Sequence, residues 1–458
     1  MKVTIKNLGN VEYGEVDISK PLTVFCGPNN TGKTYVSYIL YSLLKQQVYY
    51  SRFNQGNLDS VFVEDKSTVK LDIADLIKYR QNKILNISHS LESIFGISDT
   101  DKLSLFKNLE LQYSMPDDEF AKMVAKIELK FNFDWNGVVI EVSKSKNSTM
   151  LQFQRKNPMA KLPEDTYFFS LRLLAEIYDR LIDYPYVRSC IFPVERNSIY
   201  TFNKELSIQR NELIEQMQAL KDNRNLGYES VDRLLGRSTR YPMAIRDCLS
   251  VANDLNNLKK RMSEYAGFAE SLEQQLLGGK ITVTKEGEVE FLPKRGQRLP
   301  IQLSASIVKT LSSLTFYLKH LAKRSDLIII DEPEMNLHPD AQVELAHIFG
   351  RMVNKGLNLL ISTNSDYIIR ELNYMITLGS IADSPPLMEE LNYMDDDILK
   401  ATVVEVYLFK PKKRNSRVST IIPVEVKEDG FSMETIDAVI NELNEHSDRI
   451  NYKLKYNE

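Results

Sequence analysis

The sequence has few cysteines and no long apolar run. Its three cysteines, Cys26, Cys190 and Cys248, are far apart and form no CxxC pair. This spacing argues against a zinc site or a disulfide framework and fits a reducing cytoplasm. No stretch approaches the ~20 uninterrupted apolar residues of a membrane span, and the N-terminus lacks the apolar core of a signal peptide. We therefore expect a cytoplasmic protein with no membrane partner.

The sequence also lacks an excess of positive charge. Its 458 residues carry 58 Lys and Arg against 62 Asp and Glu, which gives a formal net charge of −4. A broadly basic nucleic-acid-binding body is therefore not indicated. Short basic runs are more often solvated surface than a nucleic-acid site, and no aromatic residues interleave with them as a stacking platform would require. These runs are residues 259–261, 294–298 and 410–414.

A glycine-rich loop near the N-terminus is the first motif that carries chemistry. The loop reads GPNNTGKT and lies between an expected strand at 22–26 and an expected helix at 35–45. Strand, loop and helix in this order favour a phosphate-binding loop over a chance turn, because exposed backbone N–H groups at a helix N-terminus hold phosphates. Lys33 is placed to reach the β and γ phosphates of ATP, and Thr34 to ligate Mg²⁺. The predicted ATP-binding residues are Gly27, Pro28, Asn29, Asn30, Thr31, Gly32, Lys33 and Thr34.

A carboxylate pair far downstream is the second motif. Asp331 and Glu332 follow the aliphatic run 327–330. Such a run before an Asp also occurs in ordinary buried strands, so the pair gains its meaning from the loop in the same chain. Asp331 is expected to hold Mg²⁺, directly or through water, and Glu332 to polarise the attacking water as general base. Adjacent residues at a strand end point to different sides, so one acid can face the metal and the other the γ phosphate.

The separation of the two motifs predicts one nucleotide-binding core that is split by a long insertion. Hydrophobic periodicity predicts strands within 2–26, a hairpin around Asn136-Gly137 and a helix at 165–183. Residues 50–125 are assigned weakly as helical, and 379–398 as an acidic loop. Further expected strands are 189–194, 280–284, 288–292, 357–362, 401–409 and 419–426, and further expected helices lie within 203–276 and at 307–322, 339–354 and 433–445.

These elements predict an α/β fold in five segments. The expected segments are the N-terminal half of the core (1–50), an insertion with strands that complete the β-lobe (51–200), a helical insertion (201–278), the C-terminal half of the core (279–378) and a C-terminal extension (379–458).

Three segments resemble one ATPase family. Residues 331–339, DEPEMNLHP, resemble the extended Walker B region of ABC-type ATPases, and are similar to the group of the overcoming-lysogenization-defect (OLD) proteins and the SMC and recombination-repair ATPases. The GPNN opening of the loop is similar to a variant common in that group, and Pro193-Val194-Glu195-Arg196 resembles its PAER segment. The resemblance covers residues 1–45, about 187–200 and 280–375. It implies an ABC-type P-loop core with a helical insertion and a small C-terminal α+β extension.

The resemblance also implies head-to-head dimers, or higher oligomers, with two ATP molecules between subunits. Each site would be completed in trans by a signature motif at a helix N-terminus, here residues 303–307 with Ser304 and Ser306. The alternative is that one of these serines only caps the helix. The family usually has glycines in this motif, and this chain has none.

A second departure from the family concerns the residue that contacts the γ phosphate after the next strand. The family usually has His at this place, and this chain has Asn364. Asn can hydrogen-bond a phosphate but does not titrate near neutral pH, so we expect slow hydrolysis or an ATP-gated clamp. His338 is interpreted as a dimer contact or a structural residue. Glu195-Arg196 links the nucleotide to the helical segment or forms a structural salt bridge; both interpretations stay open.

The tail does not resemble the Toprim nuclease of OLD-type proteins, because it is short and has no EGxxD pattern. The chain resembles instead the ATPase subunit of PARIS-type or Septu-type antiphage systems. This implies a sensor or regulatory subunit that controls a separate effector, a nuclease or toxin, in response to a nucleic acid or a phage protein. The rival hypothesis is a DNA-repair or chromosome-maintenance ATPase that binds DNA directly. A self-sufficient toxin has no nuclease constellation to support it.

Overall fold

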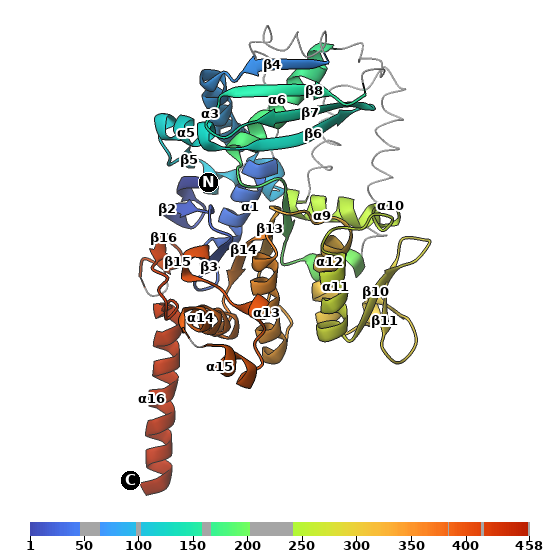
Figure 1. Cartoon of the computed structure of the whole chain (residues 1–458). Helices are drawn as coiled ribbons and strands as arrows, with labels where there is room; N and C mark the ends of the chain where they lie inside the picture. Colours follow the sequence, from blue (N-terminus) through green and yellow to red (C-terminus); the bar gives the residue numbers. More distant parts are fainter. Residues whose placement is uncertain are drawn as a thin grey trace, which may run out of the picture.

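A nine-stranded sheet forms the centre of the molecule (Figure 1). The computed structural model describes residues 1–45, 65–97, 102–157, 166–201, 241–382, 384–413 and 416–456. The strand order is β5-β1-β2-β16-β15-β3-β14-β13-β9. The strands are β1 (Lys2–Leu8), β2 (Val11–Asp17), β3 (Leu22–Cys26), β5 (Glu110–Tyr113), β9 (Ser189–Phe192), β13 (Leu327–Asp331), β14 (Asn358–Thr363), β15 (Val404–Pro411) and β16 (Ser419–Val424).

The half of this sheet from β15 to β9 is parallel. Its inner strands β3, β13 and β14 are buried along their whole length, which is why their sequences are nearly continuous apolar runs. Successive side chains serve opposite faces: Ile329 joins the cluster under helix α1, and Ile328 and Ile330 join the cluster on the other side. Helix α1 (Lys33–Lys45) packs on the first face.

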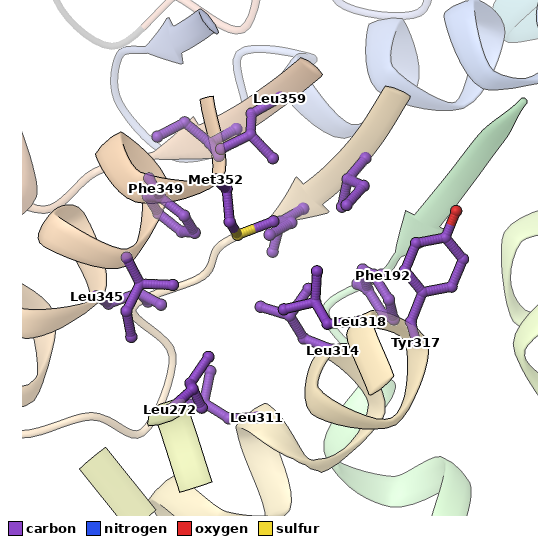
Figure 2. Close-up of a cluster of buried hydrophobic side chains, with 14 of the residues drawn as sticks. Phe192, Leu272, Leu311, Leu314, Tyr317, Leu318, Leu345, Phe349, Met352 and Leu359 are labelled. Carbon is purple, nitrogen blue, oxygen red and sulfur yellow. The ribbon is translucent and has the colours of Figure 1, made fainter. Parts of the chain in front are cut away.

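Helices α12, α13 and α14 cover the second face. Figure 2 shows the core between α12 and α13, where Leu311, Leu314 and Leu318 lie opposite Leu345 and Phe349. This core fixes the helix before β13 and the helix after it against the same strands. The helices are α12 (Ser306–His320), α13 (Pro339–Asn354) and α14 (Asp366–Ser380).

A second, four-stranded sheet lies beside the N-terminal half of the core, at the top of Figure 1. Its order is β4-β8-β7-β6, and α3, α5 and α6 pack with it. Asn136 and Gly137 both have positive φ, +49° and +84°, as a type I′ turn requires, which confirms the expected hairpin. The elements are β4 (Lys66–Lys70), β6 (Leu129–Trp135), β7 (Val138–Lys144), β8 (Met150–Arg155), α3 (Ile73–His89), α5 (Asp117–Lys126) and α6 (Thr166–Ile182).

A third sheet and short helices form the region around α12. Two of its strands, β10 (Gly279–Val283) and β11 (Val289–Pro293), confirm the expected hairpin. The expected helical segment within 203–276 is α9 (Met243–Asn253), α10 (Leu255–Leu258) and α11 (Ala266–Leu272) in its described part, and residues 202–240 lie outside the described residues. The remaining elements here are β12 (Leu299–Pro300), a π-turn at Glu273–Leu277 and a 3₁₀ turn at Ile301–Leu303.

Two sequence assignments are wrong in part, although α3, α4 (Leu91–Phe95) and α5 confirm helices within 50–125. The weak helical assignment of 50–125 missed strands β4 and β5, which are short and form because they pair with β8 and β1 far along the chain; residues 46–64 lie outside the description. The expected loop 379–398 contains helix α15 (Ser384–Glu390), since two prolines are tolerated in a first helical turn. It also contains a 3₁₀ turn, Asp395–Asp397. Within 50–125 the structure also has a 3₁₀ turn at Lys102–Phe106.

The C-terminal strands join the large sheet. β15 pairs in parallel with β3, and β16 pairs with β15 and β2, so the tail lies between the first two strands and the phosphate-loop strand. A 3₁₀ turn at Ala401–Val403 precedes them. The last helix, α16 (Glu434–Tyr456), is longer than expected and projects from the body (Figure 1). No described helix is both long and apolar enough to cross a membrane.

Candidate nucleotide site

The two sequence motifs meet at one edge of the large sheet. The glycine-rich loop leaves the C-terminal end of β3, Asp331 ends β13, and Asn364 follows the last residue of β14. These three strands are neighbours and parallel, so their carboxyl ends share an edge. This edge is where open α/β sheets bind ligands.

Two glycines of the loop hold backbone conformations that other residues adopt with strain. Gly27 has φ +132°, and a Cβ there would lie 2.5 Å from the Phe409 carbonyl oxygen. Gly32 has φ +94°, and a Cβ would lie 2.5 Å from Val11 Cγ2. The loop therefore needs glycine for its conformation and for its close packing against β15 and β2.

Side-chain hydrogen bonds to its backbone carbonyl oxygens hold the loop in place. Asn10 donates from Nδ2 to the Asn30 carbonyl oxygen over 2.9 Å. Ser419, the first residue of β16, donates from Oγ to the Thr31 carbonyl oxygen over 2.6 Å. Thr31 in turn donates from Oγ1 to the Pro28 carbonyl oxygen over 2.8 Å. The C-terminal tail thus takes part in shaping the phosphate loop.

Lys33 is buried in the loop with neutral partners. Its Nζ donates to the carbonyl oxygens of Gly27 (2.7 Å) and Pro28 (3.0 Å) and to Asn364 Oδ1 (2.9 Å). Burial lowers the pKa of the ammonium group, although the carboxylates of Glu332 and Asp331 act in the opposite direction. Within the described residues no carboxylate forms an ion pair with Lys33. A phosphate could therefore become its counter-ion without displacing one.

Thr34 and Asp331 form the oxygen pair that a magnesium ion needs. Thr34 Oγ1 donates to Asp331 Oδ2 over 2.8 Å, and Ser362 Oγ donates to Asp331 Oδ1. Asp331 is 1% exposed, and burial raises its pKa while the two hydroxyl donors oppose the rise. Hydroxyl and carboxylate oxygens are ligands that Mg²⁺ prefers, so the residues present fit a hydrated magnesium ion bound to phosphates.

Glu332 has a strained backbone that is held from both sides. Its φ is +44°, a left-handed value that is uncommon for a residue with a side chain. Its N–H donates to the Ser362 carbonyl oxygen over 2.9 Å. Its carbonyl oxygen accepts from Arg196 Nη2 over 2.7 Å, and the Asp331 carbonyl oxygen accepts from Arg196 Nη1 over 2.6 Å.

Arg196 therefore binds backbone, which speaks against a salt bridge of its side chain, and the link from the nucleotide to the helical segment stays a prediction. Its guanidinium also donates to the Pro193 carbonyl oxygen over 3.1 Å, and the residue is 2% exposed. Burial lowers its pKa to about 10, so the guanidinium is charged at neutral pH. Among the described residues it forms no side-chain salt bridge; it joins the end of β9 to the carboxylate pair.

Asn364 lies between the phosphate loop and the acidic motif. Besides accepting from Lys33, it donates from Nδ2 to Asn29 Oδ1, and its backbone N–H donates to Glu334 Oε1 over 2.7 Å. Burial raises the pKa of Glu334. Its second oxygen, Oε2, is buried and has no hydrogen-bond partner in the described part of the chain. Asn364 thus contacts both motifs, and its contact with a γ phosphate stays a prediction.

The two signature serines lie at an exposed helix N-terminus. Helix α12 begins at Ser306, and its N-cap is Ala305, which forms no side-chain cap hydrogen bond. Ser304 is buried and donates to the Pro300 carbonyl oxygen over 3.3 Å. The N-cap alternative for these serines is therefore wrong. Ser306 is exposed, and Leu303 beside it is 71% exposed, so this helix end faces outward.

Comparison with known proteins now identifies the family. Residues 1–369 match the family model of the AAA ATPase domain. The chain belongs to the AAA ATPase domain family. As a member it binds ATP and hydrolyses it, and AAA ATPases usually use Mg²⁺. No curated protein matches the chain.

Solved structures of SMC head domains are among those that match the chain. The SMC head domain of Pyrococcus furiosus, bound to the C-terminal domain of ScpA, is 13% identical, with 97% of this chain and 98% of that one covered and a TM-score of 0.35. A second SMC head, bound to the winged-helix domain of ScpA, is also 13% identical, with 93% and 98% covered and a TM-score of 0.36. The SMC head of Thermotoga maritima is 13% identical, with 93% and 98% covered and a TM-score of 0.33. The family assignment rests on the match of residues 1–369.

Other candidate residues of the AAA ATPase lie away from this edge or on its rim. His338 is the exposed N-cap residue of α13 and pairs with Asp340 at 3.3 Å. In the first of the three basic runs, Lys259 donates to two backbone carbonyl oxygens of the β10–β11 hairpin, so its ammonium group already has hydrogen-bond partners within the protein. In the other two, Arg298 lies 3.8 Å from Glu290, and Lys412 pairs with Glu12.

Sequence reasoning missed four residues that shape the site: Asn10, Ser362, Glu334 and Ser419. Glu334 had a signal, because it is part of the DEPE run, but the run does not say which carboxylate faces which group. Asn10 and Ser419 act through side-chain bonds to backbone of the loop. Such partners depend on which strands become neighbours, and short-range pattern does not reveal them.

Proposed function

We propose that two copies of this AAA ATPase enclose two ATP molecules, and that the resulting clamp acts as the sensor or regulatory subunit of a bacterial antiphage system, controlling a separate nuclease or toxin. The carrying observation is the convergence of Lys33, Thr34, Asp331 and Asn364 at one sheet edge. The exposed start of α12 supports completion of each site by the other copy. The antiphage role follows from the resemblance of the motifs to PARIS-type and Septu-type ATPase subunits.

In this proposal each side chain has one task. The loop N–H groups and Lys33 bind the β and γ phosphates, and Thr34 with Asp331 holds Mg²⁺, which would neutralise phosphate charge when bound. Glu332 takes a proton from the attacking water as general base. Asn364 holds a γ-phosphate oxygen and stays neutral at every physiological pH, so it cannot serve as an acid. Ser306 and the N-terminus of α12 meet the γ phosphate of the other copy.

Glu332→Gln tests the sandwich. The amide keeps the size of the side chain but accepts no proton, so ATP binding is retained while turnover falls about 100-fold or more. The trapped nucleotide should hold a dimer or larger assembly on size-exclusion chromatography with ATP and Mg²⁺. Lys33→Ala, which removes the phosphate contact, is the control and should elute at the same volume with and without ATP. If Glu332→Gln remained a monomer with ATP, the sandwich would be wrong.

A native pull-down from the host, followed by mass spectrometry, tests the effector. Recovery of one stoichiometric nuclease or toxin, with phage protection that needs both genes, supports a regulatory subunit. ATP-dependent DNA binding by the isolated protein, weakening steeply as salt rises, would support direct action on DNA instead. Comparing the Glu332→Gln variant with the native chain shows whether the partner binds the ATP-bound form.

A further inference from the structure

Arg196 is a buried arginine whose guanidinium binds the backbone of both acidic residues. Its two terminal nitrogens donate to the carbonyl oxygens of Asp331 (2.6 Å) and Glu332 (2.7 Å). One planar fork thus spans two consecutive peptide groups at the end of β13. Lysine, with a single ammonium group, cannot reproduce this geometry.

The place where the fork binds is the strained point of the site. The chain turns out of the β region between Asp331 and Glu332, whose φ of +44° is costly for a residue with a Cβ. On the other side of Glu332, the N–H donates to the Ser362 carbonyl oxygen over 2.9 Å, and to Ser362 Oγ over 3.3 Å. The backbone of Glu332 is therefore fixed by Ser362 before its Cα and by Arg196 after it.

A fixed backbone fixes where the side chain begins. In the β region the Cα–Cβ bond of Glu332 would point elsewhere, because rotating φ swings Cβ about the N–Cα axis. Arg196 is itself held by its surroundings, since it is 2% exposed and its third bond goes to the Pro193 carbonyl oxygen. Arg196 begins a helical stretch that follows β9 after a short turn, and β9 is paired with β13.

We infer that Arg196 is a positioning residue for Glu332: it holds the general base in the orientation for water activation and contributes little to ATP binding. This inference rests on the proposed role of Glu332. It assigns to the Pro193–Arg196 segment a part in the rate of hydrolysis. It also gives a function to a buried arginine whose hydrogen bonds go to the backbone of the carboxylate pair.

The test measures ATPase kinetics of Arg196→Met and Arg196→Lys. Methionine keeps much of the volume and removes both hydrogen bonds, so kcat should fall about 100-fold, while KM for ATP and the apparent Mg²⁺ affinity change little. Lysine can restore one bond and should give an intermediate kcat. A loss of ATP or Mg²⁺ affinity equal to the loss of kcat would overturn the inference, because Arg196 would then support the loop or Asp331.

Arg80→Met is the matched control for a purely structural effect. Arg80 is 4% exposed and donates to the Met115 carbonyl oxygen over 2.8 Å, but it lies with the four-stranded sheet. It should lower the melting temperature as Arg196→Met does and leave kcat unchanged. If both variants lost kcat in proportion to their loss of melting temperature, the effect of Arg196 would be structural only.

A double-mutant cycle with Glu332→Gln separates failure of the inference from failure of the proposed function. If Arg196 acts through Glu332, Arg196→Met has no further effect on the single-turnover rate in the Glu332→Gln background. An equal fold-loss in both backgrounds would overturn the inference. If Glu332→Gln itself left the rate unchanged, the proposed general base would be wrong and the cycle would show it first.

Discussion

Two buried lysines show how differently the large sheet and the four-stranded sheet use charge. Lys33, in the phosphate loop, donates to two carbonyl oxygens and one amide oxygen. Lys83, between α3 and α6, donates to Asp179 (2.9 Å) and Asp183 (2.7 Å) and is fully buried. Burial lowers the pKa of Lys33. In Lys83 burial acts in the same direction, but the two carboxylates outweigh it and raise the pKa.

The partners of the two lysines distinguish a buried cation that can bind a ligand from one that only stabilises the fold. A buried cation that has acidic partners is neutralised, and removing it leaves those carboxylates without compensation. A buried cation with only neutral partners carries a desolvation cost that an incoming anion can offset. The fold bears this cost at Lys33, where a phosphate is expected.

The largest effect on ATP affinity is expected from Lys33→Ala. The substitution removes the ammonium group that would bind the β and γ phosphates, so ATP affinity should fall about 100-fold or more, as expected for the loss of a charge-assisted hydrogen bond in a buried site. Stability should change little, since the lost bonds are to neutral groups. Isothermal titration with ATP and thermal melting measure the two quantities. Lys45→Ala, at the exposed end of the same helix, is the control; equal losses in both would contradict the contrast.

Lys83→Met should give the opposite result. Asp179 and Asp183 would stay buried without their cation, so unfolding free energy should fall by about 3–5 kcal/mol, while ATP affinity of the folded protein is retained. Denaturant unfolding and ATP titration measure these changes. Lys78→Met, whose lysine is 60% exposed on the same helix, should be nearly neutral. Loss of ATP binding without loss of stability would mean that Lys83 is not structural.

His347 extends the contrast to a group that titrates. Burial alone would lower its pKa, but the hydrogen bonds that the ring donates to the carboxylates of Asp397 and Glu371 outweigh burial and raise the pKa to about 9. The raised pKa means that the protonated ring stabilises the fold fully below pH about 6.5, and that this stabilisation is lost as pH rises through about 9, about 3 kcal/mol in all.

His347→Gln should therefore remove most of the fall in stability between pH 6 and pH 10 that the native chain shows. Thermal melting across this range measures it, and exposed His446→Gln is the control. If His347→Gln, like the control, kept the pH dependence of stability of the native chain, the His347 ring would not be protonated in the folded protein at neutral pH.

The smallest effect is expected on dimerisation, from a substitution at the exposed start of α12. Ser306→Glu places a negative charge at the first position of α12, where the helix itself tolerates it well, but where it would face the phosphate of the other copy. ATP-dependent dimerisation should weaken at least about tenfold, with unchanged ATP binding by the monomer. Sedimentation with and without ATP measures it, and Ser250→Glu on α9 is the control. An unaffected dimer would place the trans contact elsewhere.

Much of the core followed from local pattern. The sequence predicted two strands, three helices and two hairpins from hydrophobic periodicity and turn residues within each element. The strands are β3 and β13, and the helices are α1, α12 and α13. The short strands β4 and β5 were missed because their partners, and not their own residues, make them strands. Helix α15 was missed because its acidic, proline-containing sequence is also typical of a loop.

In the site, too, some residues could be predicted from sequence and some contacts could not. Lys33, Thr34, Asp331 and Asn364 were named from sequence, and the structure brings them together through hydrogen bonds. The bond from Arg196 to the Glu332 carbonyl oxygen could not be predicted, because a carbonyl acceptor has no signature in the side-chain sequence.

The sequence by itself determined the chemistry: a loop that can wrap phosphates, a carboxylate pair at a strand end, and an amide where a titratable group is usual. These properties depend on residue type and on spacing within a few positions. Only the tertiary structure decided that the C-terminal strands support the phosphate loop, through Ser419 and Phe409, and that the left-handed Glu332 is held by Arg196. Such contacts join residues more than 100 positions apart, and they form only once strand pairing has fixed which backbone groups lie side by side.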